Sequence, residues 1–129
     1  MSLATYMEKA ERAFSGARLL LSAGDLEGAC NSAYYAMFDA AHAALWGVNS
    51  SFASSNIKTH RGLIAAFGKE VVLGQFVPPE LSAALNQVER LRMLADYTGD
   101  PLDPADAAWA VEQASVFVGA IKTRFVAIS

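Results

Sequence analysis

The sequence contains very little cysteine, since Cys30 is the only one among 129 residues. A single cysteine excludes an internal disulfide framework and any zinc site built from several cysteines. Cys30 lies within a dense apolar segment, where a buried and unreactive thiol is the usual case. We therefore expect a cytoplasmic protein in a reducing compartment.

Long apolar runs are also missing, because no segment approaches the roughly 18 consecutive apolar residues that span a bilayer. The segment MSLATYMEKAERAF at the beginning carries acidic and basic side chains and contains no uncharged apolar stretch. That is not the pattern of a signal peptide. We expect neither a membrane span nor a secretion signal.

Charged residues make up only 18% of the chain against 53% apolar residues, with a net charge of −3 and a pI near 5.3. This balance argues against a broad DNA-binding surface but permits a local basic patch. A surplus of apolar surface on a small helical protein usually meets a partner, so we expect a homodimer or a cognate protein. The length predicts a single domain over residues 1–129.

What the chain does have is helical periodicity, and no strand pattern accompanies it. Apolar residues recur at helical spacing in five segments. These segments are 4–23, 26–47, a shorter one at 58–73, 79–97, and a last one from Asp103 as its N-cap to about Phe125. The pattern predicts an all-α fold, an antiparallel up-and-down bundle of four long helices plus one short helix.

Residues that cap helices occur at the expected boundaries. Gly24 is placed to end the first helix and Asp25 to begin the second. Asp103 is a strong N-cap candidate, and Pro104 suits the first helical position that follows it. The helix over 26–47 is apolar around most of its circumference, which predicts that it is the central helix.

One narrow stripe of this central helix is polar. Its members share about 80° of the helix circumference, and they are Asn31, Tyr35, Asp39, His42 and Trp46. The stripe faces either solvent or a groove. The neighbouring Tyr34 lies on an apolar face, and we expect it in the core.

The fourth helix places an arginine in phase with its apolar residues. Arg92 shares a face with Leu85 and Val88, whereas Arg90 points to the opposite side. A core-directed arginine needs carboxylate partners, and Asp96 and Asp39 are available. Such a pair either fixes the register of the helices or holds the arginine for a phosphate. The residues alone leave both readings open.

Three stretches, ACNSAYYAMFDAAHAAL, KTHRGLIAAF and RLRMLADY, occur in this order. Together they resemble the HEPN superfamily, and most closely its small stand-alone prokaryotic members, over about Met7 to Phe125. The resemblance implies a helical bundle that usually dimerises. Many such proteins are RNases, commonly toxins paired with a minimal nucleotidyltransferase antitoxin.

The resemblance also implies a site, because active HEPN RNases carry an arginine followed four to six residues later by a histidine. Neither Arg90 nor Arg92 is followed by a histidine at that spacing. Asp96 follows Arg92 by four residues, and a carboxylate cannot donate a proton at neutral pH as an imidazolium does. His42 or His60 would have to replace the histidine in space.

Two further groups of polar residues have the spacing of a binding site. Asp39 and His42 form half of a carboxylate-bridged metal motif, but no second motif accompanies them, so we expect no metal and no cofactor. Lys58, His60 and Arg61 form a basic cluster, which is either a phosphate contact or a solvated helix end. No phosphate-binding glycine loop or nucleophile elbow occurs.

Three functional hypotheses follow. The first is a dimeric HEPN-like module that binds RNA, a nucleotide or a nucleotidyltransferase-type partner. Its groove would be lined by Tyr35, Asp39, His42, Arg92, Asp96 and Tyr97. The second is a metal-independent endoribonuclease toxin, with catalytic candidates Arg92, Asp96, His42 and His60, in which a displaced histidine assists Arg92. The third is a purely structural helical adaptor.

Overall fold

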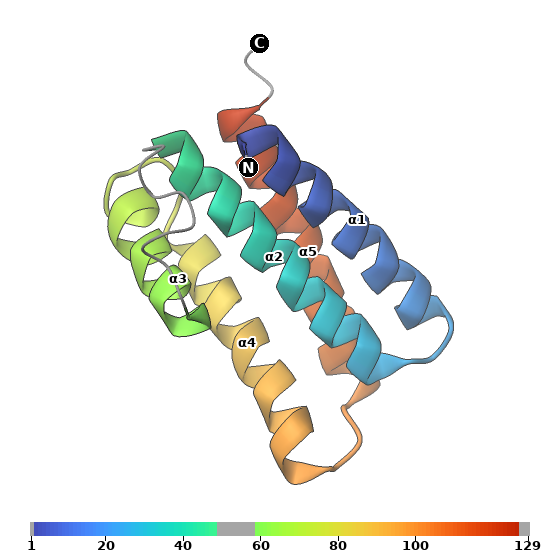
Figure 1. Ribbon diagram of the computed structural model, residues 1–129. Helices are drawn as coiled ribbons and strands as arrows, with labels where there is room; N and C mark the ends of the chain where they lie inside the picture. Colours follow the sequence, from blue (N-terminus) through green and yellow to red (C-terminus); the bar gives the residue numbers. More distant parts are fainter. Residues whose placement is uncertain (1, 49–58, 127–129) are drawn as a thin grey trace.

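The computed structural model describes residues 2–48 and 59–126. Its elements are α1 (Leu3–Ser22), α2 (Leu26–Val48), α3 (His60–Ala66), the π-helical η2 (Phe67–Val72), α4 (Glu80–Thr98) and α5 (Pro104–Phe125). No strand occurs among these described residues. Consecutive long helices run in opposite directions (Figure 1). The predicted all-α antiparallel bundle is therefore confirmed.

The helices begin and end at the capping residues that the sequence indicates. Ala23 is the C-cap of α1, and Gly24 follows it with a positive φ of 86°, a conformation that costs glycine little. The Asp25 carboxylate accepts the N–H of Gly28 at 2.9 Å, and Asp103 accepts the N–H of Ala105 at 2.8 Å. Each aspartate satisfies a backbone donor that the first helical turn would otherwise leave unpaired.

Helix α2 lies at the centre of the bundle, in contact with each of the other elements. Its alanines allow the neighbouring backbones to approach closely, and seven of them are fully buried: Ala29, Ala33, Ala36, Ala40, Ala41, Ala43 and Ala44. This confirms the prediction from its all-round apolar surface. Neither α2 nor any other described helix is long and apolar enough to cross a membrane.

The segment between α2 and α4 differs from the single helix predicted over 58–73. Lys58 lies outside the described residues, and α3 ends at Ala66, where the chain widens into η2. The N–H of Leu73 bonds to the carbonyl of Gly68, five residues earlier, at 3.0 Å. Phe67 and Val71, four residues apart, lie on the same side of this segment. Both are fully buried.

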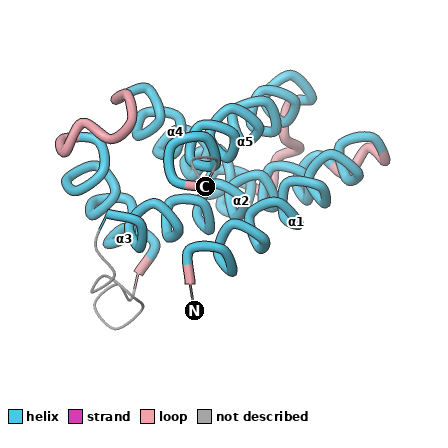
Figure 2. Tube along the Cα trace, turned by 90° about the horizontal axis from the view of Figure 1, so that it is seen from above, coloured by secondary structure: helices cyan, strands magenta, loops and turns pink. Residues whose placement is uncertain are grey.

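The short helix α3 lies to one side of the bundle, against α2 and α4 (Figure 2). Its first residue is His60, and this histidine lies where α2, α3 and α4 meet. Residues 34 and 35 of α2 and 89 and 92 of α4 contribute the neighbouring side chains. The fold thus brings together polar and aromatic residues that are far apart in sequence.

Candidate functional site

A buried tyrosine lies at the junction of α2, α3 and α4. Tyr34 has no exposed surface, yet its hydroxyl has two polar neighbours from different helices. The hydroxyl is 2.8 Å from Nδ1 of His60 and donates a longer bond of 3.5 Å toward Oε2 of Glu89. The phenol therefore joins a histidine and a carboxylate that are 29 residues apart.

Burial is the main cause that raises the pKa of Tyr34 far above its ordinary value, and the negative charge of Glu89 adds to it. The positive charge of Arg92 acts in the opposite sense. The phenol consequently stays protonated over the physiological pH range. It remains a hydrogen-bond donor with a single proton to offer.

Arg92 packs over the same tyrosine. Its Cζ lies 4.6 Å from the ring centroid of Tyr34 and 5.8 Å from that of Tyr35. The Nε atom is buried and has no hydrogen-bond partner, and no ion pair of Arg92 is found among the side chains that the structure describes. Aromatic faces attract the guanidinium charge but do not satisfy its N–H donors. An anion would satisfy them.

His60 is held by aromatic rings on several sides. It stacks on Phe38 with centroids 4.6 Å apart, lies parallel to Tyr34 at 5.5 Å, and meets Tyr35 edge-on at 5.7 Å. Burial lowers the pKa of His60, the charge of Arg92 lowers it further, and Glu89 opposes both. His60 is therefore neutral near pH 7, and a neutral imidazole can accept a proton.

The other histidine faces a different helix. His42 stacks on Tyr6 of α1 at 4.8 Å and lies 5.0 Å from Phe38. Burial lowers its pKa to about 4, and the charges of Lys9 and His60 act in the same direction. Phe38 thus contacts both histidines, but only His60 is on the side of Tyr34 and Arg92.

The remaining predicted groove residues are spread over the surroundings of this site. Asp39 is half-buried; burial raises its pKa, and Lys9 is the charge that opposes the rise. No hydrogen bond or ion pair between Asp39 and Arg92 occurs among the described residues. The side chain of Asp96 and the whole of Lys58 lie outside the described part of the structure. The Arg92–Asp96 pair therefore stays a prediction.

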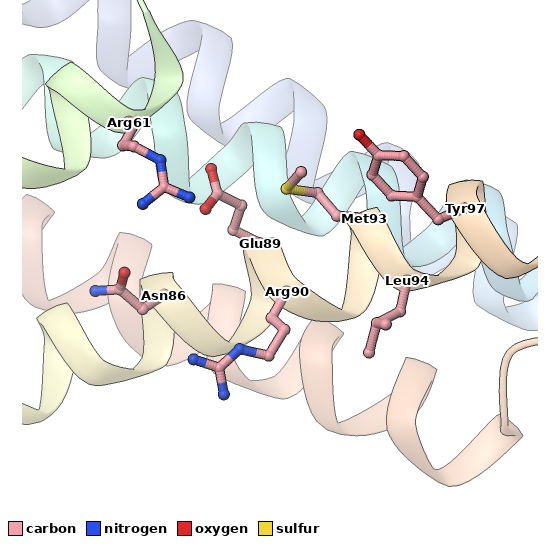
Figure 3. Close-up of a pocket in the computed structure, with 7 residues that line it drawn as sticks. All are labelled: Arg61, Asn86, Glu89, Arg90, Met93, Leu94 and Tyr97. Atoms are coloured by element: carbon pink, nitrogen blue, oxygen red, sulfur yellow. The ribbon is translucent and has the colours of Figure 1, made fainter.

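A cavity of about 280 Å³ borders the site along α4 (Figure 3). Its lining comes from α3 and α4 and comprises Arg61, Asn86, Glu89, Arg90, Met93, Leu94 and Tyr97. Figure 3 shows Arg61 and Glu89 pointing toward one another, whereas Arg90 leaves α4 on the other side. Tyr97 is 81% exposed at this cavity. Because Glu89 also bonds Tyr34, the cavity and the His60–Arg92 site share a wall.

Two residues of this site were not predicted to act in it. Tyr34 was expected in the core, which its burial confirms, but helical phase does not reveal what a buried hydroxyl meets. Glu89 precedes Arg92 by three residues and so lies on the same side of α4. That spacing is the one signal that could have pointed to it.

The described residues contain no group of three or more histidine, cysteine, aspartate or glutamate side chains placed to hold a metal ion. The groups that the structure brings together at this site are a guanidinium, an imidazole and a phenol. These groups can bind a phosphate and transfer a proton.

Comparison with known proteins agrees with this architecture. A UPF0332 protein of Gloeobacter violaceus is 32% identical over 123 residues, which cover 95% of this chain and 89% of that protein. A Methanocaldococcus jannaschii protein whose name calls it a candidate toxin is 32% identical over 116 residues, 90% of this chain and 83% of its own. The family model described as HEPN domain matches residues 3–124. The chain therefore belongs to the HEPN domain family.

Proposed function

We propose that this HEPN protein binds RNA at the His60–Arg92 site and cuts it without a metal ion, in a toxin-like role. The observation that carries the proposal is that one buried tyrosine, Tyr34, contacts both His60 and Arg92. The Tyr34 hydroxyl lies 2.8 Å from His60 Nδ1, and its ring lies under Arg92 at 4.6 Å. His60, on α3, thus lies near Arg92, on α4. The similarity to a protein named as a candidate toxin supports the toxin-like role.

The chemistry follows from these groups. Neutral His60 takes the proton of a ribose 2′-hydroxyl, and the 2′-oxygen attacks the adjacent phosphorus. The 5′-oxygen leaves and takes a proton from solvent, so the products are a 2′,3′-cyclic phosphate and a 5′-hydroxyl end. Arg92 binds the non-bridging oxygens and stabilises the charge that develops on them.

The cavity beside the site offers contacts for the flanking nucleotides. Arg61 and Arg90 are exposed and present guanidinium groups that suit phosphates. The exposed ring of Tyr97 gives a base a surface on which to stack. This local basic surface is compatible with a chain whose overall net charge is −3.

The test is to incubate the purified protein with single-stranded RNA in excess chelator. The same sequence as DNA and as 2′-O-methyl RNA provides matched controls, because neither has a free 2′-hydroxyl. We expect only the RNA to be cut, with cyclic phosphate ends. Intact RNA, or cutting that needs a divalent metal or extends to the DNA, would contradict the proposal.

Binding without cleavage is the second candidate function. The observation that favours it is Asp96, which stands where active HEPN RNases carry a histidine. In that case RNA or a nucleotide is retained by the wild-type protein but recovered intact. Arg92→Met would weaken retention by at least about tenfold, because the phosphate loses its bidentate donor.

We further propose a homodimer and a nucleotidyltransferase-type partner protein. Tyr97, 81% exposed at the cavity, is accessible to a partner that transfers a nucleotidyl group. Co-expression with such a partner and mass spectrometry of the isolated chain would detect the added group. A group that persists in the Tyr97→Phe variant would exclude this tyrosine as the acceptor.

A further inference from the structure

The Tyr34 hydroxyl has one proton and two neighbours that accept protons. His60 Nδ1 lies 2.8 Å away from it and Glu89 Oε2 lies 3.5 Å away. We propose that Glu89, acting through Tyr34, is a positioning residue that holds His60 in the Nδ1–H form and so presents Nε2 as the base. We call this Glu89–Tyr34–His60 chain of hydrogen bonds the relay. Its chemical role rests on the proposed RNA cleavage, but the hydrogen bonds can be tested without it.

Two proton arrangements fit the positions of the three side chains. If Tyr34 donates to His60 Nδ1, its oxygen faces the Glu89 carboxylate with no proton between them. If His60 Nδ1–H donates to the Tyr34 oxygen, the tyrosine proton points to Glu89, and each acceptor has a donor. A buried pair of facing acceptors is costly, and a hydrogen bond to a charged acceptor is the stronger kind. The second arrangement is therefore favoured.

The aromatic surroundings hold the imidazole of His60 in one orientation, with Nδ1 toward Tyr34. Phe38 and Tyr34 lie along the faces of the imidazole and Tyr35 lies against its edge. With Nδ1 turned to Tyr34, Nε2 is on the opposite side of the ring. No hydrogen bond of Nε2 occurs within residues 2–48 and 59–126. Nε2 is thus the nitrogen left to accept a proton from a ribose hydroxyl.

The charged groups around His60 give the relay a second measurable property. Glu89 and Arg92 face it from α4, Tyr34 and Tyr35 face it from α2, and His42 lies beyond Phe38. Glu89 raises the pKa of His60, whereas Arg92 lowers it. Removing the Glu89 charge must therefore lower that pKa further. The low-pH limb of the pH–rate profile, where the rate rises as His60 loses its proton, would move to lower pH in the same variant.

The experiment is nuclear magnetic resonance of the isotope-labelled imidazole nitrogens, which distinguishes the two neutral forms of histidine without any substrate. The His42→Gln variant assigns the signals of His60. We expect the Nδ1–H form in the wild-type protein and a shift to the Nε2–H form in Glu89→Gln and in Tyr34→Phe. Glu80→Gln, on the same helix but exposed, and Tyr97→Phe are the matched controls and should leave the form unchanged.

A wild-type His60 in the Nε2–H form would overturn the relay, and so would an unchanged form in both Glu89→Gln and Tyr34→Phe. This result is independent of RNA cleavage. The predicted form in a protein that cuts no RNA would contradict the proposed function alone. If RNA is cut, we expect the cleavage rate of Glu89→Gln near neutral pH to fall by about tenfold to hundredfold, which is smaller than the roughly 10²- to 10⁴-fold cost of losing the general base itself.

Discussion

At the scale of single residues, Arg92 has the most unusual surroundings. A guanidinium that leaves water usually finds a carboxylate, because an uncompensated charge costs several kcal/mol. Here the described contacts of Arg92 are the rings of Tyr34 and Tyr35, and its Nε is buried without a partner. A buried donor without a partner favours a site that an anion completes.

Replacing Arg92 by methionine keeps an unbranched apolar side chain but removes the charge. We expect Arg92→Met to fold with a loss of about 1 kcal/mol, the size of a partly exposed cation–π contact. RNA affinity should fall at least about tenfold, because hydrogen bonds to a charged group contribute about 1.5–3 kcal/mol. Chemical denaturation and filter binding measure the two effects, and the exposed Arg90→Met is the control for stability.

The adaptor hypothesis predicts a different outcome for the same position. There Arg92→Ala unfolds the protein, and Arg92→Met combined with Asp96→Leu restores its stability, since an apolar pair replaces a buried ion pair. Restored stability together with unchanged RNA affinity would contradict the proposal that Arg92 binds RNA.

His42 predicts how stability depends on pH. Its pKa falls from an ordinary 6.5 to about 4 in the folded protein, mainly through burial. Between these values the unfolded chain binds the extra proton, so stability decreases as pH falls from 6.5 to 4. Because His42 is partly exposed, screening reduces the effect to the order of 1 kcal/mol.

The measurement is urea unfolding of wild-type and His42→Phe across that pH window. Phenylalanine keeps an aromatic ring against Tyr6 but cannot titrate, so the variant should lose less stability on acidification. The raised pKa of Asp39 acts in the opposite sense in both proteins, and the difference between them isolates His42. Parallel curves would contradict the prediction.

The sequence predicted this site only in part. Arg92 stood out because it breaks an apolar face, and His60 because it lies in a basic cluster. Their proximity could not be predicted, since it depends on the path of the chain between α2 and α4. Tyr34 was hidden for a different reason: periodicity assigns a side chain to a face and does not locate its terminal oxygen.

At the scale of elements, the close packing of α2 depends on its alanines. Ala40 has no exposed surface, so a larger side chain there must displace a neighbouring helix. We expect Ala40→Leu to lower the free energy of unfolding by about 1–3 kcal/mol. The exposed Ala108→Leu on α5 is the matched substitution and should change it by less than about 0.5 kcal/mol. Thermal denaturation distinguishes the two, and equal losses would contradict the central placement of α2.

The helices themselves were predictable, because long amphipathic repeats and capping aspartates are local signals. Asp25 and Asp103 cap as expected. The π-helical η2 was not predictable, because no local sequence pattern distinguishes it from an α-helix and its residues contact distant parts of the chain. Phe67 lies 5.2 Å from Phe117 of α5, a contact between distant parts of the chain.

At the scale of the whole molecule, several large apolar side chains remain exposed in the described structure. They are Leu19, Leu73, Leu94, Tyr97, Trp109 and Val116. Exposed apolar groups of this kind favour association. We expect a homodimer, and light scattering on a sizing column should give twice the chain mass of 13.7 kDa. A mass of one chain at micromolar concentration would contradict this expectation.

The most direct test of the central claim compares the two histidines. His60 and His42 both contact Phe38, but only His60 meets the Tyr34 hydroxyl. Single-turnover cleavage of RNA in chelator should slow by about 10²- to 10⁴-fold in His60→Gln, the usual cost of losing a general base. His42→Gln should cleave at nearly the wild-type rate. Equal rates for wild-type and His60→Gln, or a loss confined to His42→Gln, would contradict the account.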